Sequence, residues 1–219
     1  MKKQISWDKI KPETQSVWGG ETDVFPHRAT QTPTVNSVAY GYDDMDEWVQ
    51  VTKGQKEGHI YSRNSNPTVD VLEEKIRILE GAQAATSFSS GMAAISNTLF
   101  AHLKSGDRVV ASKDTYGGTS KIFIEFLPKY GIKVKLCDTT DYHQIEKEVA
   151  KDCQLLYLET PTNPTLKIQD IQKLSEAGKS VGALVVVDNT LATPINQLPL
   201  ALGADLVIHS ATKFLCGHS

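Results

Sequence analysis

The part of the chain after residue 66 alternates between short apolar runs and segments whose apolar residues have helical spacing. The apolar runs predict strands, at 85–88, 108–111, 133–136, 155–158, 183–187 and 205–209. The helical spacing predicts the helices between them, at 67–80, 91–103, 119–130, 143–150 and 168–177. Short apolar strands separated by helices are typical of a mostly parallel sheet covered on both faces. We therefore expect a three-layer α/β sandwich.

The first 38 residues have a different pattern, with little periodicity and many threonine, proline and other polar residues. We interpret this segment as an extended arm that packs on another subunit, and a disordered tail is the alternative. A short helix is expected within 43–53. The expected organisation is an arm at 1–60, followed by a ligand-binding α/β domain at 61–219.

The composition narrows the functional classes. The chain has 219 residues, a formal net charge of −3, 40% hydrophobic residues and 22% charged residues, which is typical of a globular protein. This charge gives no basic surface for nucleic acid or for an anionic membrane, and no apolar run approaches the roughly 20 residues of a spanning helix. The start of the chain lacks the apolar stretch of a signal peptide. Three widely spaced cysteines favour reduced thiols in the cytoplasm, and the six histidines show no metal-ligand spacing.

Polar residues follow the last two predicted strands, where ligands of open parallel sheets bind. Asp188 comes after five apolar residues, and a buried carboxylate needs a cation or hydrogen-bond donors; capping of a turn is the alternative. Lys213 follows the strand at 205–209, and an amine there can form a Schiff base if its pKa is lowered. Ser210 and Thr212 beside it can donate to a phosphate. Taken alone, Ser-x-Thr-Lys favours a solvated lysine in a loop.

Two earlier strand ends also carry candidate residues. Ser90 and Gly91 begin a helix, where free N–H groups and the helix dipole favour an anion, although ordinary capping has the same pattern. Tyr116 lies beside two glycines, either as a stacking residue or as a core tyrosine. The dinucleotide and P-loop fingerprints are absent from the sequence, so a single phosphate fits better than a pyrophosphate. A phosphate cradle, a carboxylate, an aromatic ring and an amine together meet the requirements of pyridoxal phosphate.

Six stretches carry a family resemblance: YSRNSNPT, SFSSGMAA, DTYGGT, LETPTNPT, VVVDNTLATP and HSATKFLCGHS. In these stretches the chain resembles the Cys/Met-metabolism family of pyridoxal-phosphate-dependent enzymes, which have the aspartate-aminotransferase type fold (fold type I). The resemblance runs from about residue 14 to residue 219. It implies that the segment 61–219 is a cofactor-binding domain.

The resemblance also implies roles for individual residues. Lys213 would form the Schiff base with the cofactor and shuttle protons, Asp188 would keep the pyridine nitrogen protonated, and Tyr116 would stack on the ring and assist proton transfer. The implied phosphate ligands are Ser90, Gly91, Met92, Ser210 and Thr212.

Four more residues have implied roles around the cofactor. Tyr61 and Arg63 would reach the phosphate of the neighbouring subunit's cofactor, and the guanidinium fork suits a phosphate. Asn163 would lie near the phenolic oxygen of the cofactor and the substrate carboxylate, with Glu159 close to it. A site shared in this way implies a homo-oligomer, at least a dimer and, as is usual in the family, a dimer of dimers.

The implied reaction is elimination or replacement at the γ or β carbon of sulfur amino acids or O-acylhomoserine, as in cystathionine γ-synthase or γ-lyase. Gly118 stands where methionine γ-lyases commonly have a cysteine, which disfavours that activity. The family continues past the lysine into a C-terminal domain, so we expect this chain to be truncated. One alternative is a noncatalytic cofactor-binding fragment or an assembly scaffold. Another is a nucleotide-binding α/β module, which the missing fingerprints disfavour.

Overall fold

A computed structural model describes residues 6–21 and 29–217. The chain divides into two compact units, one ending at Ser87 and the other beginning at Phe88. This boundary lies downstream of residue 60, where the sequence suggested a division. The role of the first segment as an intersubunit arm stays a prediction.

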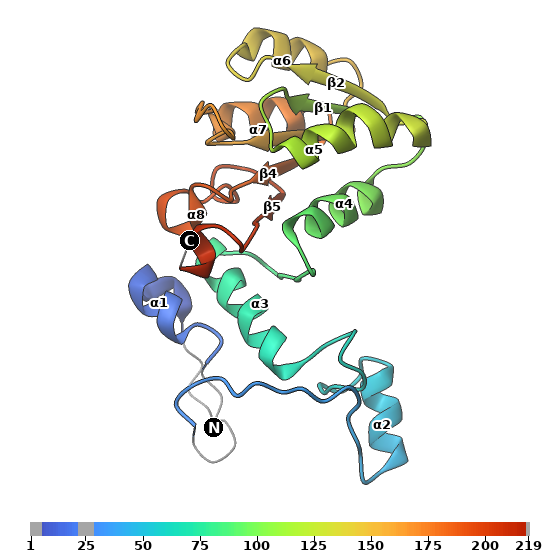
Figure 1. The fold of residues 1–219 in the computed structure, drawn as a ribbon, viewed down its shortest axis with the longest axis vertical. Coiled ribbons are helices and arrows are strands. Elements are labelled where there is room, and N and C mark those ends of the chain that lie inside the picture. The colour runs from blue at the N-terminus through green and yellow to red at the C-terminus, as the bar shows by residue number, and fades with distance from the viewer. Residues whose placement is uncertain (1–5, 22–28, 218–219) are drawn as a thin grey trace. The chain divides into compact units, whose positions relative to one another are not determined.

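The first unit contains η1 (Trp7–Lys9), α1 (Pro12–Trp18), α2 (Met45–Thr52) and α3 (Pro67–Glu80) (Figure 1). The helix α3 has the predicted ends, because the side chain of Asn66 accepts the N–H of Thr68 at 2.9 Å and Gly81 closes the helix with a φ of 65°. In the described part of the expected arm, η1 and α1 are helical, which the sequence pattern did not indicate. Pro12 suits the first position of α1. Residues 1–5 and 22–28 of the expected arm lie outside the described residues.

The second unit is built on a five-stranded sheet. Its strands are β1 (Arg108–Ser112), β2 (Lys133–Cys137), β3 (Leu155–Glu159), β4 (Leu184–Asp188) and β5 (Leu206–Ile208). They lie in the order β2-β1-β3-β4-β5, and every neighbouring pair is parallel. This confirms the parallel α/β fold predicted from the apolar runs.

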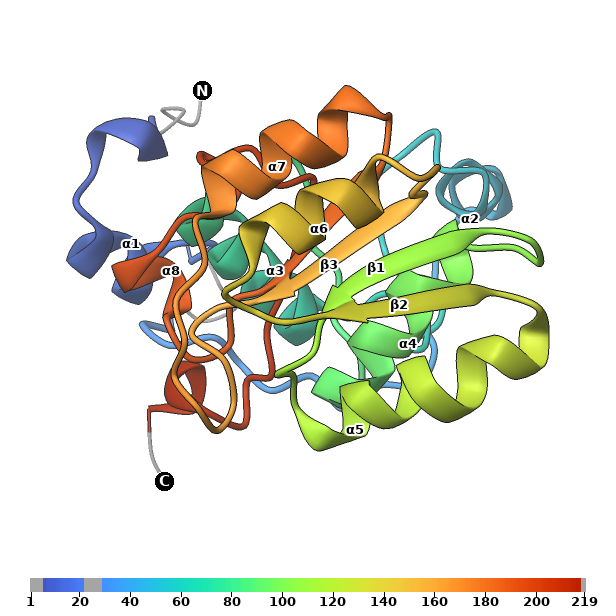
Figure 2. The same ribbon diagram turned by 90° about the horizontal axis from the view of Figure 1, so that it is seen from above.

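Helices cover both faces of this sheet. The helices are α4 (Gly91–His102), α5 (Gly117–Lys121), η3 (Ile122–Phe126), η4 (Leu127–Tyr130), α6 (Tyr142–Val149), α7 (Ile171–Ser180), α8 (Thr193–Asn196) and η5 (Phe214–Cys216). Figure 2 shows α6 and α7 on one face, and α4 and α5 on the other. The unit therefore has the three layers expected from the sequence.

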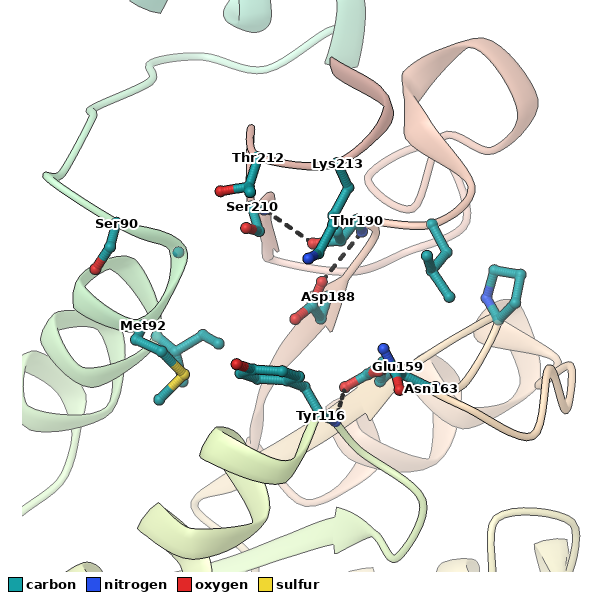
Figure 3. Close-up of a pocket in the computed structure, with 14 residues that line it drawn as sticks. Ser90, Met92, Tyr116, Glu159, Asn163, Asp188, Thr190, Ser210, Thr212 and Lys213 are labelled. Atoms are coloured by element: carbon teal, nitrogen blue, oxygen red, sulfur yellow. Dashed lines mark hydrogen bonds between the residues drawn. The ribbon is translucent and has the colours of Figure 1, made fainter. Parts of the chain in front are cut away.

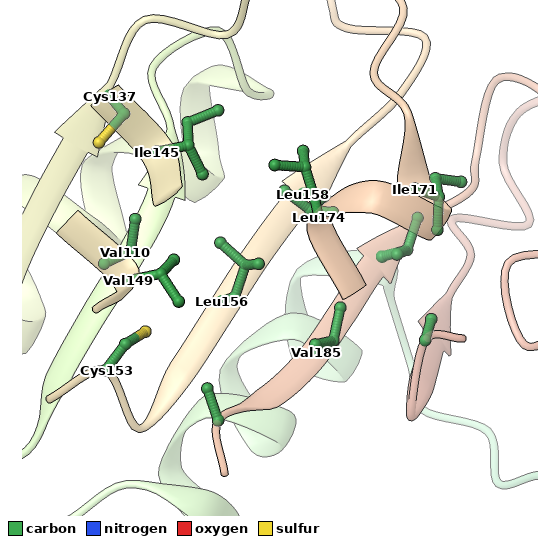
Figure 4. Packing of buried hydrophobic residues seen from close by; sticks show 13 residues of the cluster. Val110, Cys137, Ile145, Val149, Cys153, Leu156, Leu158, Ile171, Leu174 and Val185 are labelled. Atoms are coloured by element: carbon green, nitrogen blue, oxygen red, sulfur yellow. The ribbon is translucent and has the colours of Figure 1, made fainter. Parts of the chain in front are cut away.

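The core of the second unit follows from strand alternation, because successive side chains point to opposite faces. On the face of α6 and α7, Val110, Leu156 and Val185 pack with Ile145 and Leu174 (Figure 4). Each of these side chains is almost completely buried, and such burial stabilises the fold by roughly 1.5–3 kcal/mol per side chain.

The opposite face carries its own apolar cluster. Here Val109, Tyr157 and Val186 pack with Leu99 of α4 and Phe123 of η3. Because β3 and β4 pair residue by residue, Glu159 follows Tyr157 on this face at the end of β3, and Asp188 follows Val186 at the end of β4.

Three sequence expectations need correction. Residues 85–88 form no strand: they are mostly exposed, and the Ser87 N–H and hydroxyl donate to the Glu73 carboxylate at 2.6 and 2.8 Å. The predicted helix at 119–130 consists of α5, η3 and η4 in succession, with Pro128 in η4. The helix α7 begins at Ile171 and not at residue 168, because Asp170 caps it by accepting the N–H of Lys173.

Within the ranges 6–21 and 29–217, no helix is long and apolar enough to cross a membrane.

Candidate functional site

The topology of the sheet indicates that ligands bind at the carboxyl ends of its strands. The chain passes from β1 outward to β2 and then crosses to β3 on the other side of β1. Ligands of open α/β sheets bind outside the carboxyl ends of the strands at such a reversal. The loops after β1, β3, β4 and β5 all leave from this end, since the strands are parallel.

A pocket of about 240 Å³ lies at this end of the sheet (Figure 3). It is lined by residues from the starts of α4 and α5 and from the loops that follow β3, β4 and β5. The lining residues are Ser90, Gly91, Met92, Ile95, Tyr116, Glu159, Pro161, Asn163, Asp188, Thr190, Leu191, Ser210, Thr212 and Lys213. All lie in the second unit. The structure thus brings together every candidate residue from the sequence except Tyr61 and Arg63.

Asp188 is the last residue of β4 and has only 6% of its surface exposed. One carboxylate oxygen, Oδ1, accepts the N–H of Thr190 at 3.1 Å, and the other, Oδ2, accepts the hydroxyl of Tyr157 at 3.2 Å. Burial raises the pKa of this carboxyl, and the hydrogen bonds oppose that effect. Both donors are neutral, so a cationic group in the pocket would stabilise the buried charge further.

Glu159 is paired in register with Asp188 across β3 and β4. Its Oε2 accepts the N–H of Tyr116 at 2.8 Å, and its Oε1 accepts the N–H of Asn163 at 3.1 Å. Burial raises its pKa to about 7, and the charge of Asp188 acts in the same direction. The Glu159 carboxylate therefore joins the loop after β1 to the loop after β3.

Tyr116 presents an exposed ring on a fixed backbone. Its ring points into the pocket (Figure 3), and 46% of the residue's surface is exposed. Gly118 allows this arrangement, because a Cβ there would lie 2.8 Å from both Met92 Sδ and Tyr116 Cε1. The ring is free to stack on a planar ligand.

The start of α4, with Ser210 and Thr212 beside it, can receive an anion. Ser90 caps α4 by accepting the Ala93 N–H at 3.1 Å, and the first N–H groups of this helix lie at its N-terminus. Gly91 brings that terminus against Ser210, since a Cβ at residue 91 would lie 2.7 Å from Ser210 Cβ. The hydroxyls of Ser210 and Thr212 border the same pocket. A phosphate group matches this set of donors.

Lys213 follows β5 and lies at the N-terminus of η5. Figure 3 shows its amine end pointing toward Thr190 and Asp188. The backbone N–H of Ser210 donates to the hydroxyl of Thr190 at 2.9 Å, which joins the loop of Lys213 to the loop after β4.

Tyr61 and Arg63 lie in the first unit. The guanidinium carbon of Arg63 lies 5.2 Å from the centre of the Tyr61 ring, and both residues are exposed. Tyr61 also forms an antiparallel bridge with Ala39. Their function toward a neighbouring subunit stays a prediction.

Sequence reasoning missed two residues that act on Asp188. Thr190 lies two residues after Asp188, at the end of the strand, and could have been included on that ground. Tyr157 has the pattern of a core residue, and the available signal was that a buried phenol needs a hydrogen-bond partner.

Comparison with known proteins identifies the family. The model of the family described as "Cys/Met metabolism PLP-dependent enzyme" matches residues 13–219, where PLP is pyridoxal phosphate. The chain belongs to this family.

Several family members are similar over most of this chain. The L-methionine gamma-lyase of Fusobacterium nucleatum subsp. polymorphum is 43% identical over 85% of this chain and 47% of its own length. The cystathionine gamma-lyase of Bacillus subtilis (strain 168) is 40% identical over 96% of this chain and 53% of its own length. The chain spans about half the length of the curated relatives it matches.

A solved structure extends the comparison to the cofactor. A protein from Campylobacter jejuni, named as a candidate O-acetylhomoserine (thiol)-lyase, has a TM-score of 0.89 and 31% identity, covering 96% of this chain and 52% of its own. That structure contains N'-pyridoxyl-lysine-5'-monophosphate. The pocket of this PLP-family chain fits the same cofactor, because it combines the N-terminus of α4, an exposed ring at Tyr116 and a buried carboxylate at Asp188. Gly91 has no Cβ that would fill the space beside Ser210.

Proposed function

We propose that the protein containing this chain is a PLP-dependent enzyme that eliminates or replaces a leaving group at the γ or β carbon of sulfur amino acids or O-acylhomoserine. The observation that carries the proposal is that one pocket is lined by Lys213, Asp188, Tyr116 and the start of α4. PLP supplies an electron sink that makes the α-proton of a linked amino acid acidic. Lyases of sulfur amino acids among the relatives support this class of reaction.

The residues of the pocket divide the work of binding in this proposal. Asp188 takes the protonated ring nitrogen, and Tyr116 stacks on the ring. The N–H groups at the start of α4 hold the phosphate together with the hydroxyls of Ser210 and Thr212. Asn163 bonds the phenolic oxygen of the cofactor from the loop after β3.

Lys213 performs the proton transfers. Its Nζ would hold the cofactor by a covalent bond, and its free amine would act as the general base toward the α-proton of the substrate. Lys213 returns that proton to the carbon chain or to the departing group, and Tyr116 assists through its phenolic oxygen.

The first unit completes the site from a neighbouring subunit in this proposal. Tyr61 and Arg63 reach the phosphate of the partner's cofactor, where the guanidinium forms a bidentate pair. The protein is then a homo-oligomer, at least a dimer and in its full form a dimer of dimers. A monomer obtained by dilution should release PLP, and a monomer that kept PLP and activity would contradict this part.

A substrate panel tests the proposed function. Purified protein is given PLP and then methionine, cysteine, cystathionine or O-acetylhomoserine with a thiol, and keto acid, ammonia, free thiol and thioether product are measured. We expect at least one substrate to be converted, and Lys213→Ala to abolish the conversion. Conversion of none would overturn the proposal in favour of a noncatalytic cofactor-binding scaffold, which the lyase relatives do not favour.

A further inference from the structure

Tyr157 contacts Asp188, one of the residues that line the pocket. It is on β3, is completely buried, and donates its hydroxyl to Asp188 Oδ2 at 3.2 Å. In the register of the sheet it pairs with Val186, two residues before Asp188 on the same face. Tyr157 does not line the pocket, so its action on a ligand must pass through the carboxylate.

The surroundings of Tyr157 hold its hydroxyl in place. The Phe123 ring packs edge-on against the Tyr157 ring, with 5.2 Å between the ring centres and 74° between the planes. Both side chains belong to the apolar cluster on the α4 face. Since the hydroxyl of a phenol is rigidly placed by its ring, this packing fixes the donor that Asp188 meets.

Packing alone does not require this hydroxyl. Phenylalanine would fill nearly the same space, and a buried hydroxyl costs free energy unless it is hydrogen-bonded. Burial and the nearby carboxylates raise the pKa of Tyr157 well above its ordinary value, so the phenol stays protonated and remains a donor. It therefore meets Asp188 as a permanent, neutral hydrogen-bond donor.

We propose that Tyr157 is a positioning residue that fixes the Asp188 carboxylate and stabilises its negative charge, so that this carboxylate meets the ring nitrogen of bound PLP. The Thr190 N–H on Oδ1 and the Tyr157 hydroxyl on Oδ2 hold the two oxygens from different sides. The inference rests on the proposed function, in which Asp188 takes that nitrogen.

The test compares Tyr157→Phe with the matched variant Tyr142→Phe. Tyr142 lies on α6, packs against the cluster on the opposite face, and loses one hydrogen bond in the same substitution, the one its hydroxyl accepts from the Asp170 N–H at 3.0 Å. Equilibrium dialysis with PLP measures the dissociation constant, and urea denaturation verifies that both variants fold. We expect Tyr157→Phe to weaken PLP binding about tenfold or more, as for loss of a hydrogen bond to a charged group. Tyr142→Phe should leave binding unchanged.

A PLP analogue with carbon in place of the ring nitrogen separates positioning from a general structural effect. The wild-type protein and Tyr157→Phe should bind this analogue equally, because Asp188 has no cation to meet. Equal losses for PLP and the analogue would overturn the inference, as would unchanged PLP affinity in Tyr157→Phe. If the wild-type protein binds no PLP, the proposed function is wrong and the inference is wrong with it. If the wild-type protein binds PLP and Tyr157→Phe binds it equally well, only the inference is wrong.

Discussion

Replacement of Glu159 by glutamine probes the connection between the two loops that border the pocket. The carboxylate accepts the Tyr116 N–H at 2.8 Å and the Asn163 N–H at 3.1 Å. Glutamine has one carbonyl oxygen and an NH₂ group, so one backbone amide would face another donor. The variant therefore loses one of the two bonds that join the loop after β1 to the loop after β3.

The pH dependence of stability gives this prediction a magnitude. Burial raises the pKa of Glu159 from 4.5 to about 7, so the folded protein binds this proton more tightly than the unfolded chain does. The resulting stabilisation is complete below about pH 4.5 and is lost as the pH rises through about 7. The difference between the two pKa values corresponds to about 3 kcal/mol in the free energy of unfolding. Most of this stabilisation is lost between about pH 5 and about pH 8. Glutamine has no proton to lose over this range.

Urea denaturation of the cofactor-free wild-type and Glu159→Gln proteins at about pH 5 and at about pH 8 tests this prediction. We expect the stability of wild type relative to the variant to fall by about 2.5 kcal/mol from the lower to the higher pH. Glu176→Gln, at an exposed position of α7, is the control and should show the small effect of a solvated carboxylate. A wild-type-to-Glu159→Gln difference that does not change with pH would refute the argument.

Two further substitutions test the proposed phosphate site at the start of α4 and the apolar core. Gly91→Ala should weaken PLP binding and lower the free energy of unfolding, measured with urea, by about 1–3 kcal/mol, because the added Cβ would lie 2.7 Å from Ser210 Cβ. Gly117→Ala is the control and should change neither quantity, because a Cβ at residue 117 meets nothing within 4 Å. Leu156→Ala should lower the free energy of unfolding by about 2–5 kcal/mol with PLP affinity unchanged, because Leu156 packs on the face away from the pocket. A loss below about 1 kcal/mol would contradict the packing described for Leu156.

The three central strands of the sheet, β1, β3 and β4, could be predicted from the sequence because they are buried on both faces. Such strands appear as continuous apolar runs, and Leu155–Glu159 and Leu184–Asp188 lie where these runs indicated. The run at 85–88 was misleading, since it is short, half polar and mostly exposed. The helices in the first 18 residues were missed because they are too short to show a periodic pattern.

The pocket could be predicted because parallel strands bring their carboxyl ends together. Asp188 ends a strand, Tyr116 and Lys213 each come after one, and the parallel sheet brings all three residues to the same pocket. The contacts of Tyr157 and Glu159 could not be read from spacing, because they depend on the register between β3 and β4 and on loops that fold back onto the strand end.

The attachment of the cofactor to Lys213 is the central claim, and trapping tests it most directly. The protein is incubated with PLP, reduced with borohydride, digested and analysed by mass spectrometry. We expect the pyridoxyl group on Lys213 in the wild-type protein. In the Lys213→Ala variant no single lysine should carry most of the label. Labelling spread over exposed lysines such as Lys129 and Lys151, with Lys213 unmodified, would contradict the account.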